Sequence, residues 1–285
     1  MAVLTADDPA RTVSAVAAAV WYPSHTEAEP RVLRWARDTH AELRRQAADG
    51  VPGVVDRATR MWLRRPYAGP PWWADACGDL VAEPASPPYT ALLRFTAPTV
   101  TMTRYLPWLY RQVAADGGRI VRRALDRLGD AHEFAPTVVN ATGLAAGRLA
   151  ADPAVHPVRG HVVLVANPGL TVSVRDEDDP AGLTYVHPRE RDVVLGGTYQ
   201  VGVGHTRPDP ETAAAIRRRC VALVPGLADA PVLGERIGLR PARHGGPRVE
   251  RDRSDGRLVH AYGHGGSGVT LSWGCAAEVA DLALS

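Results

Sequence analysis

The sequence predicts a mixed α/β fold, of the α+β type, in which an antiparallel sheet is inserted into an alternating framework. Three observations predict it. Helical and strand patterns alternate over the first half of the 285 residues, strand patterns cluster after His161, and no internal repeat or low-complexity linker divides the chain. A chain of this length holds one large domain or two interleaved domains.

The first half begins with a short apolar strand over Ala2–Thr5 and a run of small residues that ends at Trp21. Pro30 at a first-turn position, followed by apolar residues three and four apart, predicts a helix that closes near Gly50. Prolines among the tryptophans of residues 54–94 predict irregular or edge-strand structure. The remaining elements of this half are a helix capped near Thr101 that runs to about Ala115 and a strand over 136–143 that breaks into a tight glycine turn.

The second half is dominated by strand patterns. Asp209 followed by Pro210 predicts the N-cap and first turn of the one helix in its middle. Ser254-Asp255-Gly256 predicts a hairpin turn. The expected elements are strands over 162–165, 183–186 and 192–197 with a hairpin between the last two, a hairpin formed by 248–250 and 258–260, and a final helix over about 269–284.

Charge and composition exclude several classes of protein. The 33 cationic residues are all arginine and nearly balance 31 acidic residues, so the net charge of +2 is too small to indicate nucleic-acid binding. Without lysine, neither Schiff-base catalysis nor a phosphate-loop lysine is available. No run reaches the roughly 18 apolar residues of a membrane span, and the start lacks a signal-peptide pattern. We therefore expect a cytoplasmic protein that binds neither nucleic acid nor a membrane.

The cysteines, histidines and acidic residues form no recognisable motif. Cys77, Cys220 and Cys275 are widely spaced without a CxxC pair, and the ten histidines are scattered without HExxH, so we expect no metal. The sequence contains no GxSxG elbow. The only acidic cluster, residues 176–179, predicts a solvated loop.

A glycine-rich block near the C-terminus is the most informative stretch. Four glycines lie within residues 263–268, and the block leads directly into the expected final helix. Glycines leave backbone amides and carbonyls open to a ligand, and the N-terminus of a helix favours negative charge. The block therefore fits a planar cofactor that can carry negative charge. An ordinary turn before a helix is an equal alternative.

Arg240 and Tyr185 are the other candidates. Arg240 precedes Pro241 and so lies in extended backbone, where an inward-pointing guanidinium would clamp a carboxylate through two hydrogen bonds. A buried structural ion pair is the alternative that spacing alone favours. Arg243 is expected to be solvated. Tyr185 is expected to pack in the core of its strand, although its hydroxyl could instead reach a ligand carboxylate.

Taken together, the sequence resembles the D-amino-acid oxidase family of flavoenzymes. The similarity lies in VAAAVW at residues 16–21, VNATG at 139–143, VRGH at 158–161, YVHP through LGG at 185–197, GER through GLRP at 234–241, and YGHGG through WGC at 262–275. The blocks follow the family's order and span nearly the whole chain. The last block is quite specific.

The resemblance implies an FAD enzyme that oxidises D-amino acids to 2-oxo acids, ammonia and hydrogen peroxide. Arg240 matches the family's carboxylate-binding arginine, Tyr185 its partner hydroxyl, and Gly266 the glycine whose carbonyl accepts a hydrogen bond from the substrate amine. Hydride transfer to flavin needs no protein acid or base, so no catalytic residue of that kind is expected. The positions that fall at the family's flavin contacts are Thr12, Ser14, Ala18, Trp21, Gly265, Ser267, Gly268, Val269 and Thr270.

The resemblance also implies two interleaved domains. A Rossmann-like FAD-binding domain would comprise residues 1–50, 101–160 and 236–285, and an antiparallel-sheet substrate domain residues 51–100 and 161–235. The family opens with a strand, a GxGxxG turn and a helix that bind the FAD pyrophosphate, and Met1 falls where its second strand begins. On this basis the FAD-binding domain is N-terminally truncated, and the chain as given is expected to bind FAD weakly or not at all.

Two alternatives stay open. One is a related flavin oxidase for glycine or D-aspartate, since Tyr22 stands where some members carry a glutamine near the substrate. The other is a catalytically incompetent remnant that lacks the FAD pyrophosphate site. The partners expected for the enzyme are a D-amino acid and molecular oxygen, and a homodimer is left open.

Overall fold

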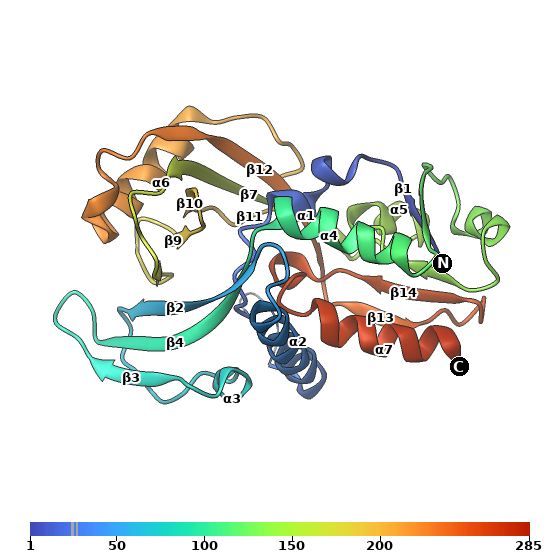
Figure 1. The fold of residues 1–285 in the computed structure, drawn as a ribbon, viewed down its shortest axis with the longest axis horizontal. Coiled ribbons are helices and arrows are strands. Elements are labelled where there is room, and N and C mark those ends of the chain that lie inside the picture. Colours follow the sequence, from blue (N-terminus) through green and yellow to red (C-terminus); the bar gives the residue numbers. More distant parts are fainter. Residues whose placement is uncertain (24–25, 27) are drawn as a thin grey trace.

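The computed structural model describes residues 1–285 except residues 24, 25 and 27, and the described part contains three β-sheets. The largest sheet has nine strands, which Figure 1 shows on the left. Eight of them follow the order β11-β7-β10-β9-β8-β2-β4-β3, and β12 pairs with the long strand β7. The strands are β2 (Val54–Leu63), β3 (Val81–Pro84), β4 (Ala91–Val100), β7 (Val155–Ala166), β8 (Ser173–Asp176), β9 (Thr184–Pro188), β10 (Asp192–Gly196), β11 (Gln200–Val201) and β12 (Val232–Arg243).

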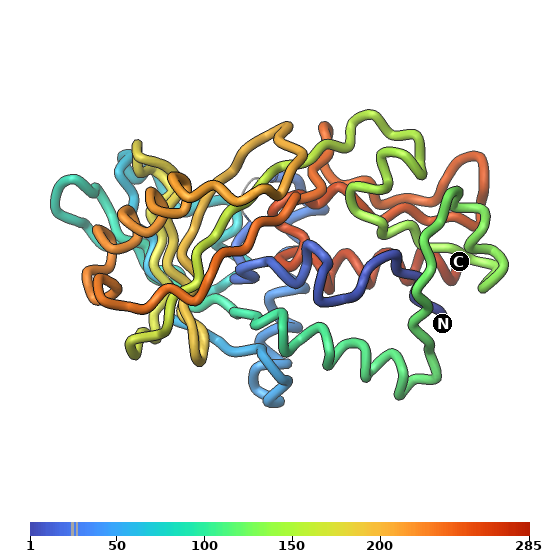
Figure 2. The backbone as a smooth tube through the Cα atoms, turned by 90° about the horizontal axis from the view of Figure 1, so that it is seen from above, coloured from blue at the N-terminus to red at the C-terminus, as the bar shows by residue number. Residues whose placement is uncertain are grey.

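Two smaller sheets lie at the opposite end of the molecule, together with both chain termini (Figures 1 and 2). One contains the parallel pair β1 and β5, and in the other β14 pairs parallel with β6 and antiparallel with β13. These strands are β1 (Ala2–Thr5), β5 (Arg119–Arg122), β6 (Val138–Asn140), β13 (Arg248–Arg251) and β14 (Leu258–Tyr262).

The helices cover the sheets and connect the two ends. Figure 1 shows α6 over one face of the large sheet, α7 beside β13 and β14, and α2 between the two ends. The helices are α1 (Val13–Val16), α2 (Pro30–Ala48), α3 (Ala74–Cys77), α4 (Met102–Ala115), α5 (Ala146–Leu149), α6 (Pro210–Leu223) and α7 (Ser272–Leu284).

The predicted mixed α/β fold is confirmed, and so are most of its elements. The first strand, α2 and α4 lie where their patterns predict them. Asp209 caps α6, because its Oδ1 accepts hydrogen bonds from the backbone N–H groups of Glu211 and Thr212 at 3.1 and 3.2 Å. The two predicted hairpins, β9–β10 and β13–β14, are antiparallel pairs. The final helix begins at Ser272, three residues later than expected, because a 3₁₀ turn over Gly265–Ser267 and a further turn precede it.

The prediction for residues 54–94 is partly wrong. β2 is a ten-residue strand in the interior of the large sheet, paired parallel with β8 and antiparallel with β4. The prolines of this region lie outside β2: Pro66 follows its last residue, Leu63, and Pro84 ends the edge strand β3. A proline interrupts a sheet only where its missing N–H would have joined a ladder, so these prolines bound the strands instead of breaking them.

The large sheet has two different faces because successive side chains alternate along each strand. On one face, Val163 and Val165 of β7 pack with Ile216 and Cys220 of α6. On the other face, Val162 and Val194 pack with Tyr185, and this cluster also contacts Ala18 from the N-terminal segment. The candidate active-site residues lie on this second face.

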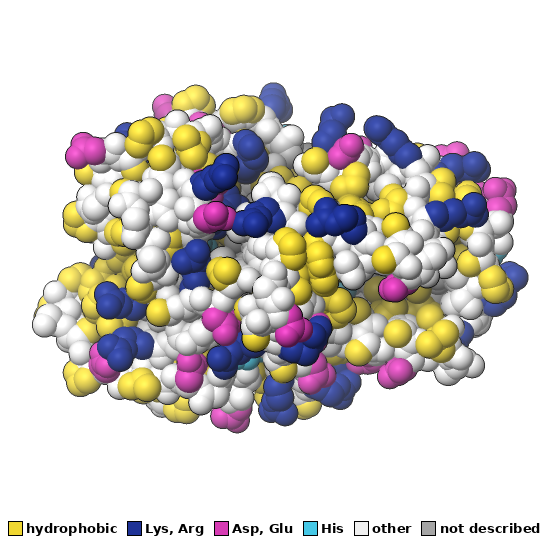
Figure 3. Space-filling model, in the orientation of Figure 1, with side chains coloured by type: hydrophobic (Ala, Val, Ile, Leu, Met, Phe, Trp, Pro, Cys, Tyr) yellow, Lys and Arg dark blue, Asp and Glu magenta, His cyan; other side chains and the backbone are white. Residues whose placement is uncertain are grey.

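Charged side chains of both signs are distributed over the surface. On the face of the molecule that Figure 3 shows, arginine and acidic side chains are interspersed. Within the described residues, no helix is both long enough and apolar enough to cross a membrane.

Candidate active site

Arg240 lies on β12, opposite Val158 of β7. Its guanidinium lies against Gly160, where a Cβ would stand 2.4 Å from Nη1. Nη1 donates a hydrogen bond to the carbonyl oxygen of Thr198 at 3.1 Å. No carboxylate of a described residue forms an ion pair with Arg240, so the structural ion pair that spacing favours is wrong. A half-buried guanidinium with only a neutral partner has donors left for an anion.

Tyr185 lies on β9 opposite Gly196 of β10 and is 6% exposed. Its ring occupies the space above Gly196, where a Cβ would stand 1.9 Å from Cζ. Core packing of the ring is therefore confirmed, but the hydroxyl makes no hydrogen bond to any described residue. Burial raises the pKa of Tyr185, although the charges of Arg240 and Arg175 oppose this shift. The hydroxyl thus stays protonated and can donate.

Gly266 and Tyr199 complete the surroundings of Arg240. A Cβ on Gly266 would lie 3.6 Å from Cδ of Arg240 and 3.9 Å from the ring of Tyr199. The Cζ of Arg240 lies 5.6 Å from the centroid of the Tyr199 ring. The structure therefore brings Arg240, Tyr185 and Gly266 to one place, around residues 196–198. Tyr199 was not among the predicted site residues, because nothing in its local sequence separates it from an ordinary strand tyrosine.

Arg175 on β8 is a second buried cation at this place, and sequence reasoning also missed it. Its Cζ lies 3.8 Å from the centroid of the Tyr22 ring and 5.8 Å from that of Tyr185. Its charge is matched, because Nε pairs with Oε1 of Glu177 at 3.1 Å. The Tyr22 hydroxyl donates to Oε2 of the same carboxylate at 3.3 Å. Beside them, His187 stacks on Tyr185, and burial lowers its pKa well below 6.5, so its imidazole is neutral.

The acidic residues 176–179 do not form the solvated loop that their composition predicts. Asp176 ends β8 and is 1% exposed, and its Oδ2 lies 2.8 Å from Nη2 of Arg64. Asp178 pairs with Arg65 in the same way. Arg64 and Arg65, more than a hundred residues away in the sequence, thus neutralise part of the run together with the adjacent Arg175, and only the fold shows the two distant pairings.

The N-terminal positions expected near the flavin lie along α1 and the segment after it. Thr12 precedes α1 and Ser14 lies within it. The helix packs on β12, since a Cβ on Gly238 would stand 3.2 Å from Cγ2 of Val13.

Further along this segment, Ala18 contacts the Tyr185 cluster, and Trp21 enters the core. Trp21 is fully buried, its Nε1 donates to the carbonyl of Ala36 at 2.9 Å, and its backbone N–H donates to the carbonyl of Pro98. Its indole therefore belongs to the core.

The C-terminal positions form the turn that leads into α7. Ser267 is fully buried, and Gly265 packs against Ala242 of β12. Thr270 holds Tyr22 at both backbone groups, because its Oγ1 accepts from the N–H and donates to the carbonyl, each at 3.2 Å.

The donors of this turn fit a flavin that can carry negative charge. Among the described residues, the amides of Gly268, Val269 and Thr270 have no hydrogen-bond acceptor. Three unpaired amides directly before a helix form a donor set for an anionic group. The nearby side chain of His264 adds no charge, because burial lowers its pKa to about 4.

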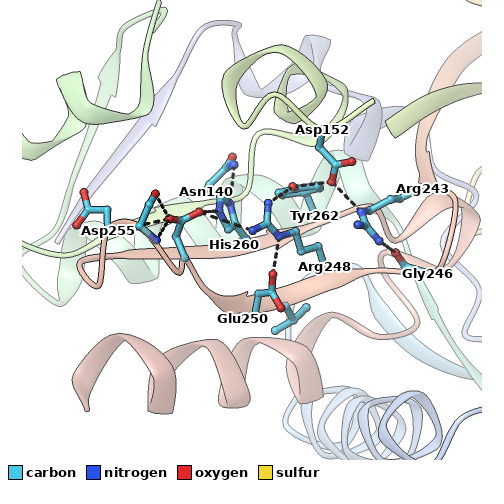
Figure 4. A network of polar contacts seen from close by, with 12 residues as sticks. Asn140, Asp152, Arg243, Gly246, Arg248, Glu250, Asp255, His260 and Tyr262 are labelled. Carbon is cyan, nitrogen blue, oxygen red and sulfur yellow. Dashed lines mark hydrogen bonds and ion pairs between the residues drawn. The ribbon is translucent and has the colours of Figure 1, made fainter. Parts of the chain in front are cut away.

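A polar network lies behind this turn, and Figure 4 shows it from close by. Arg243 is not solvated, contrary to expectation: its Nε pairs with Oδ2 of Asp152 at 2.8 Å. The Tyr262 hydroxyl donates to the same oxygen at 2.9 Å and accepts from Nη1 of Arg248 at 3.0 Å. Further along, His260 contacts Asn140 at the end of β6. The network ties β6, β12, β13 and β14 together beside the glycine-rich block.

Comparisons with known proteins cover nearly the whole chain. A family model described as FAD dependent oxidoreductase matches residues 1–282. A D-amino-acid oxidase from Rubrobacter xylanophilus is 48% identical over 99% of this chain and 87% of its own length. The D-aspartate oxidase of Homo sapiens is 34% identical over 95% of this chain and 83% of its own. The crystal structure of glycine oxidase from Geobacillus kaustophilus has a TM-score of 0.83 at 18% identity, with 99% and 87% coverage, which shows a shared fold.

Proposed function

Because this chain belongs to the FAD dependent oxidoreductase family and FAD is its cofactor, we propose that it oxidatively deaminates D-amino acids to 2-oxo acids, ammonia and hydrogen peroxide. One observation carries the proposal. The guanidinium of Arg240 has a neutral carbonyl as its partner, and its charge acts on Tyr185, whose hydroxyl makes no hydrogen bond to a described residue. The 48% identical D-amino-acid oxidase supports the choice of substrate.

Binding of the α-carboxylate is assigned to Arg240 and Tyr185. The guanidinium offers a planar fork that matches a carboxylate, and charge-assisted hydrogen bonds of this kind are the strong ones. The Tyr185 hydroxyl adds a third donor from an apolar wall, and its raised pKa keeps the proton in place. Gly266 would accept a hydrogen bond from the amine through its carbonyl. Contacts at both ends orient the Cα–H bond, which converts binding energy into a productive geometry.

Bound FAD supplies the acceptor for the hydride that leaves Cα. The protein itself then has to position the substrate and exclude water from the site. No side chain of the site needs to take up a proton. The unpaired amides of residues 268–270 would stabilise negative charge on the cofactor. We assign the cofactor contacts to Thr12, Ser14, Ala18, Trp21, Gly265, Ser267, Gly268, Val269 and Thr270.

The division into two domains is part of the same proposal. Residues 1–50, 101–160 and 236–285 would bind FAD, and residues 51–100 and 161–235 would cover the substrate. The boundaries pass through β7 and β12, so both strands run from one domain into the other. This arrangement supports a site between the domains, because Tyr185 lies on the large sheet and the glycine-rich block follows β14. We also propose a cytoplasmic location, molecular oxygen as electron acceptor and a homodimer, which cell fractionation, oxygen consumption and light scattering would test.

A panel of amino acids tests the function. The purified chain is mixed with excess FAD, and peroxide and 2-oxo acid are measured with D-amino acids, their L-enantiomers, glycine and D-aspartate. We expect peroxide from neutral D-amino acids in equal amounts to oxo acid and none from the L-enantiomers. A preference for glycine or D-aspartate would instead assign the chain the substrate of a related flavin oxidase. Absence of peroxide from a chain that shows a flavin spectrum would refute the proposal.

A further inference from the structure

His187 and Tyr185 lie two residues apart on β9 and form a stacked pair of rings. Side chains alternate along a strand, so both residues point to the face of the large sheet that carries the site. The ring centroids are 4.7 Å apart, and the ring planes are inclined by 17°. His187 is 2% exposed and Tyr185 is 6% exposed. The buried imidazole therefore gives the phenol ring a flat contact surface.

The neighbouring strands give the Tyr185 ring room but no flat support. On β10, the missing side chain of Gly196 leaves the space that the end of the ring occupies, since a Cβ there would stand 1.9 Å from Cζ and 2.4 Å from the hydroxyl oxygen. On β8, Arg175 is paired with Tyr185, but its Cζ lies 5.8 Å from the ring centroid, near the outer limit of a contact between a cation and a ring. Of these three neighbours, His187 is the one that lies against the ring face to face.

The Tyr185 hydroxyl has no anchor of its own, because it forms no hydrogen bond to a described residue. Its oxygen lies on the long axis of the ring, so the place of the oxygen depends on the direction in which the ring leaves the strand. That direction is the χ1 rotamer, and packing against the ring selects it. A ring that lost its contact with the imidazole could therefore carry the hydroxyl away from its present place.

The stacked imidazole carries no charge. Burial lowers the pKa of His187 well below 6.5, and the charge of Arg175 acts in the same direction. A protonated ring would add a third positive charge beside Arg240 and Arg175, which both already act on Tyr185. A neutral ring supports the phenol without disturbing the proton that the phenol would donate to a carboxylate.

Keeping an imidazole at this place has a cost. Nδ1 of His187 is buried without a hydrogen-bond partner among the described residues, whereas buried polar atoms are almost always paired in native proteins. An aliphatic side chain would fill the space without that cost, but it offers no flat face to an aromatic ring. The flat face is therefore the property of His187 that the site uses.

We propose that His187 is a positioning residue whose flat ring holds the phenol of Tyr185 so that the hydroxyl points at the substrate's α-carboxylate. The inference rests on the proposed function, in which Arg240 and Tyr185 bind that carboxylate. In this arrangement His187 touches neither the substrate nor the flavin. It acts on binding only through the direction of the Tyr185 ring, so its effect can be separated from a general effect on stability.

Two apolar replacements test the flat face. His187→Leu fills the space without a flat ring and His187→Phe keeps one, and both remove the unpaired nitrogen, so both should fold. With the FAD-loaded chain and D-alanine, we expect KM to rise about tenfold in His187→Leu while kcat changes by less than about a factor of two, because a hydrogen bond to a charged group is lost from binding. In His187→Phe, KM should stay within about a factor of two of the wild type. Equal KM values in the two variants would overturn the inference.

Val186→Ala is the matched control, because Val186 lies between the two rings in sequence but is buried on the other face of the sheet, in the cluster that packs with α6. It should destabilise the fold and leave KM unchanged. A double-variant cycle with Tyr185→Phe then separates positioning from a structural role. In the Tyr185→Phe background, His187→Leu should raise KM by less than about a factor of two, since the hydroxyl that it misplaces is already gone. Equal factors in both backgrounds would show that His187 does not act through Tyr185.

Calorimetry with propanoate separates failure of the inference from failure of the function. Propanoate carries a carboxylate but no amine, so it can occupy the carboxylate site and cannot be deaminated. Its Kd with the FAD-loaded chain should rise about tenfold in His187→Leu and stay unchanged in His187→Phe. That result would support the positioning role even if no D-amino acid gave peroxide. An unchanged Kd in His187→Leu, or no binding of propanoate to the wild type, would refute the role, and peroxide formation would then still uphold the oxidase function.

Discussion

The guanidinium of Arg240 lies over Gly160 so closely that a Cβ on Gly160 would stand 2.4 Å from Nη1. Gly160 of β7 is paired with a second glycine, Gly238, which lies on β12, the strand that carries Arg240. Both glycines leave space on the side of the sheet where the site lies, one for the guanidinium and one for α1. The position of the proposed carboxylate anchor is thus set by a missing side chain on the adjacent strand.

Gly160→Ala should impair substrate binding more than stability. The new methyl group meets the end of a flexible side chain, so the guanidinium must move while the backbone can stay. We expect the free energy of unfolding to change by less than about 1 kcal/mol and kcat/KM to fall about tenfold or more through loss of a charge-assisted hydrogen bond. Gly226→Ala, where a Cβ meets nothing within 4 Å, is the control. Unaltered kinetics in Gly160→Ala would show that the guanidinium does not need this place.

Arg240→Lys should fail to replace the arginine. An ammonium keeps the charge but lacks the planar fork, so at least one charged hydrogen bond to the carboxylate is lost. Steady-state kinetics should show kcat/KM reduced by about 10- to 100-fold. Arg236→Lys changes an exposed arginine of the same strand and should leave kcat/KM within a factor of two. If both variants behaved alike, Arg240 would have no role in binding.

Tyr185→Phe and Tyr105→Phe form a pair with opposite expected effects. The Tyr185 hydroxyl has no partner among the described residues, so its removal should leave the free energy of unfolding nearly unchanged and raise KM. The Tyr105 hydroxyl donates to Gln46 at 2.8 Å and accepts from Trp273 at 3.0 Å. Its removal should cost about 1–3 kcal/mol of stability and leave KM unchanged. Denaturant titration and kinetics measure both quantities, and a large destabilisation in Tyr185→Phe would argue for a structural hydroxyl.

Asp152→Ala should destabilise the protein strongly, because one buried carboxylate serves both Arg243 and Tyr262. We expect the free energy of unfolding to fall by about 2–4 kcal/mol, since a partly buried guanidinium and a buried phenol lose their partner. The double variant with Arg243→Met should cost less than the sum of the two single changes, because it removes the unpaired charge. Strict additivity in urea titrations would show that the pair is not coupled.

His264 should make the protein less stable at mildly acidic pH. Burial lowers its pKa from 6.5 to about 4 in the folded state. Between these values the unfolded chain binds a proton that the folded chain does not, so stability falls as pH drops from 6.5 to 4. The loss attributable to this group is of the order of 2–3 kcal/mol. His264→Gln should give a shallower pH dependence of the free energy of unfolding, while His187 and His40 contribute equally to both proteins. Parallel profiles would contradict the assignment.

The local elements and the candidate residues could be predicted from sequence because their signals are local. Asp209 before Pro210 marks the start of α6, and the spacing of apolar residues after Pro30 marks α2. Four glycines before a helix indicate a ligand-binding turn through the chemistry of the residues themselves. Arg240 and Tyr185 emerged from short motifs for the same reason.

Which acidic residue each arginine pairs with could not be predicted from such local signals. The run 176–179 is acidic in sequence, but its charges are matched by Arg64, Arg65 and Arg175, of which the first two lie more than a hundred residues away. In a chain whose 33 cations are all arginine, composition cannot show which of them pairs with which acid. The interior position of β2 was not predicted for a similar reason, because its pairing with β8 and β4 depends on how the whole sheet assembles.

By itself, the sequence determined the mixed α/β class, the four long helices α2, α4, α6 and α7, the two hairpins, and the residue types that a carboxylate and a flavin require. Only the tertiary structure decided that, among the described residues, Arg240 has no carboxylate partner while Arg243 has one, although the two arginines lie three residues apart on one strand. The physical reason is that a charge is satisfied through space. Gly160 and Asp152 are distant from β12 in sequence. Folding places Gly160 against Arg240, where the missing side chain leaves room for the guanidinium, and it places Asp152 beside Arg243 as a counter-charge.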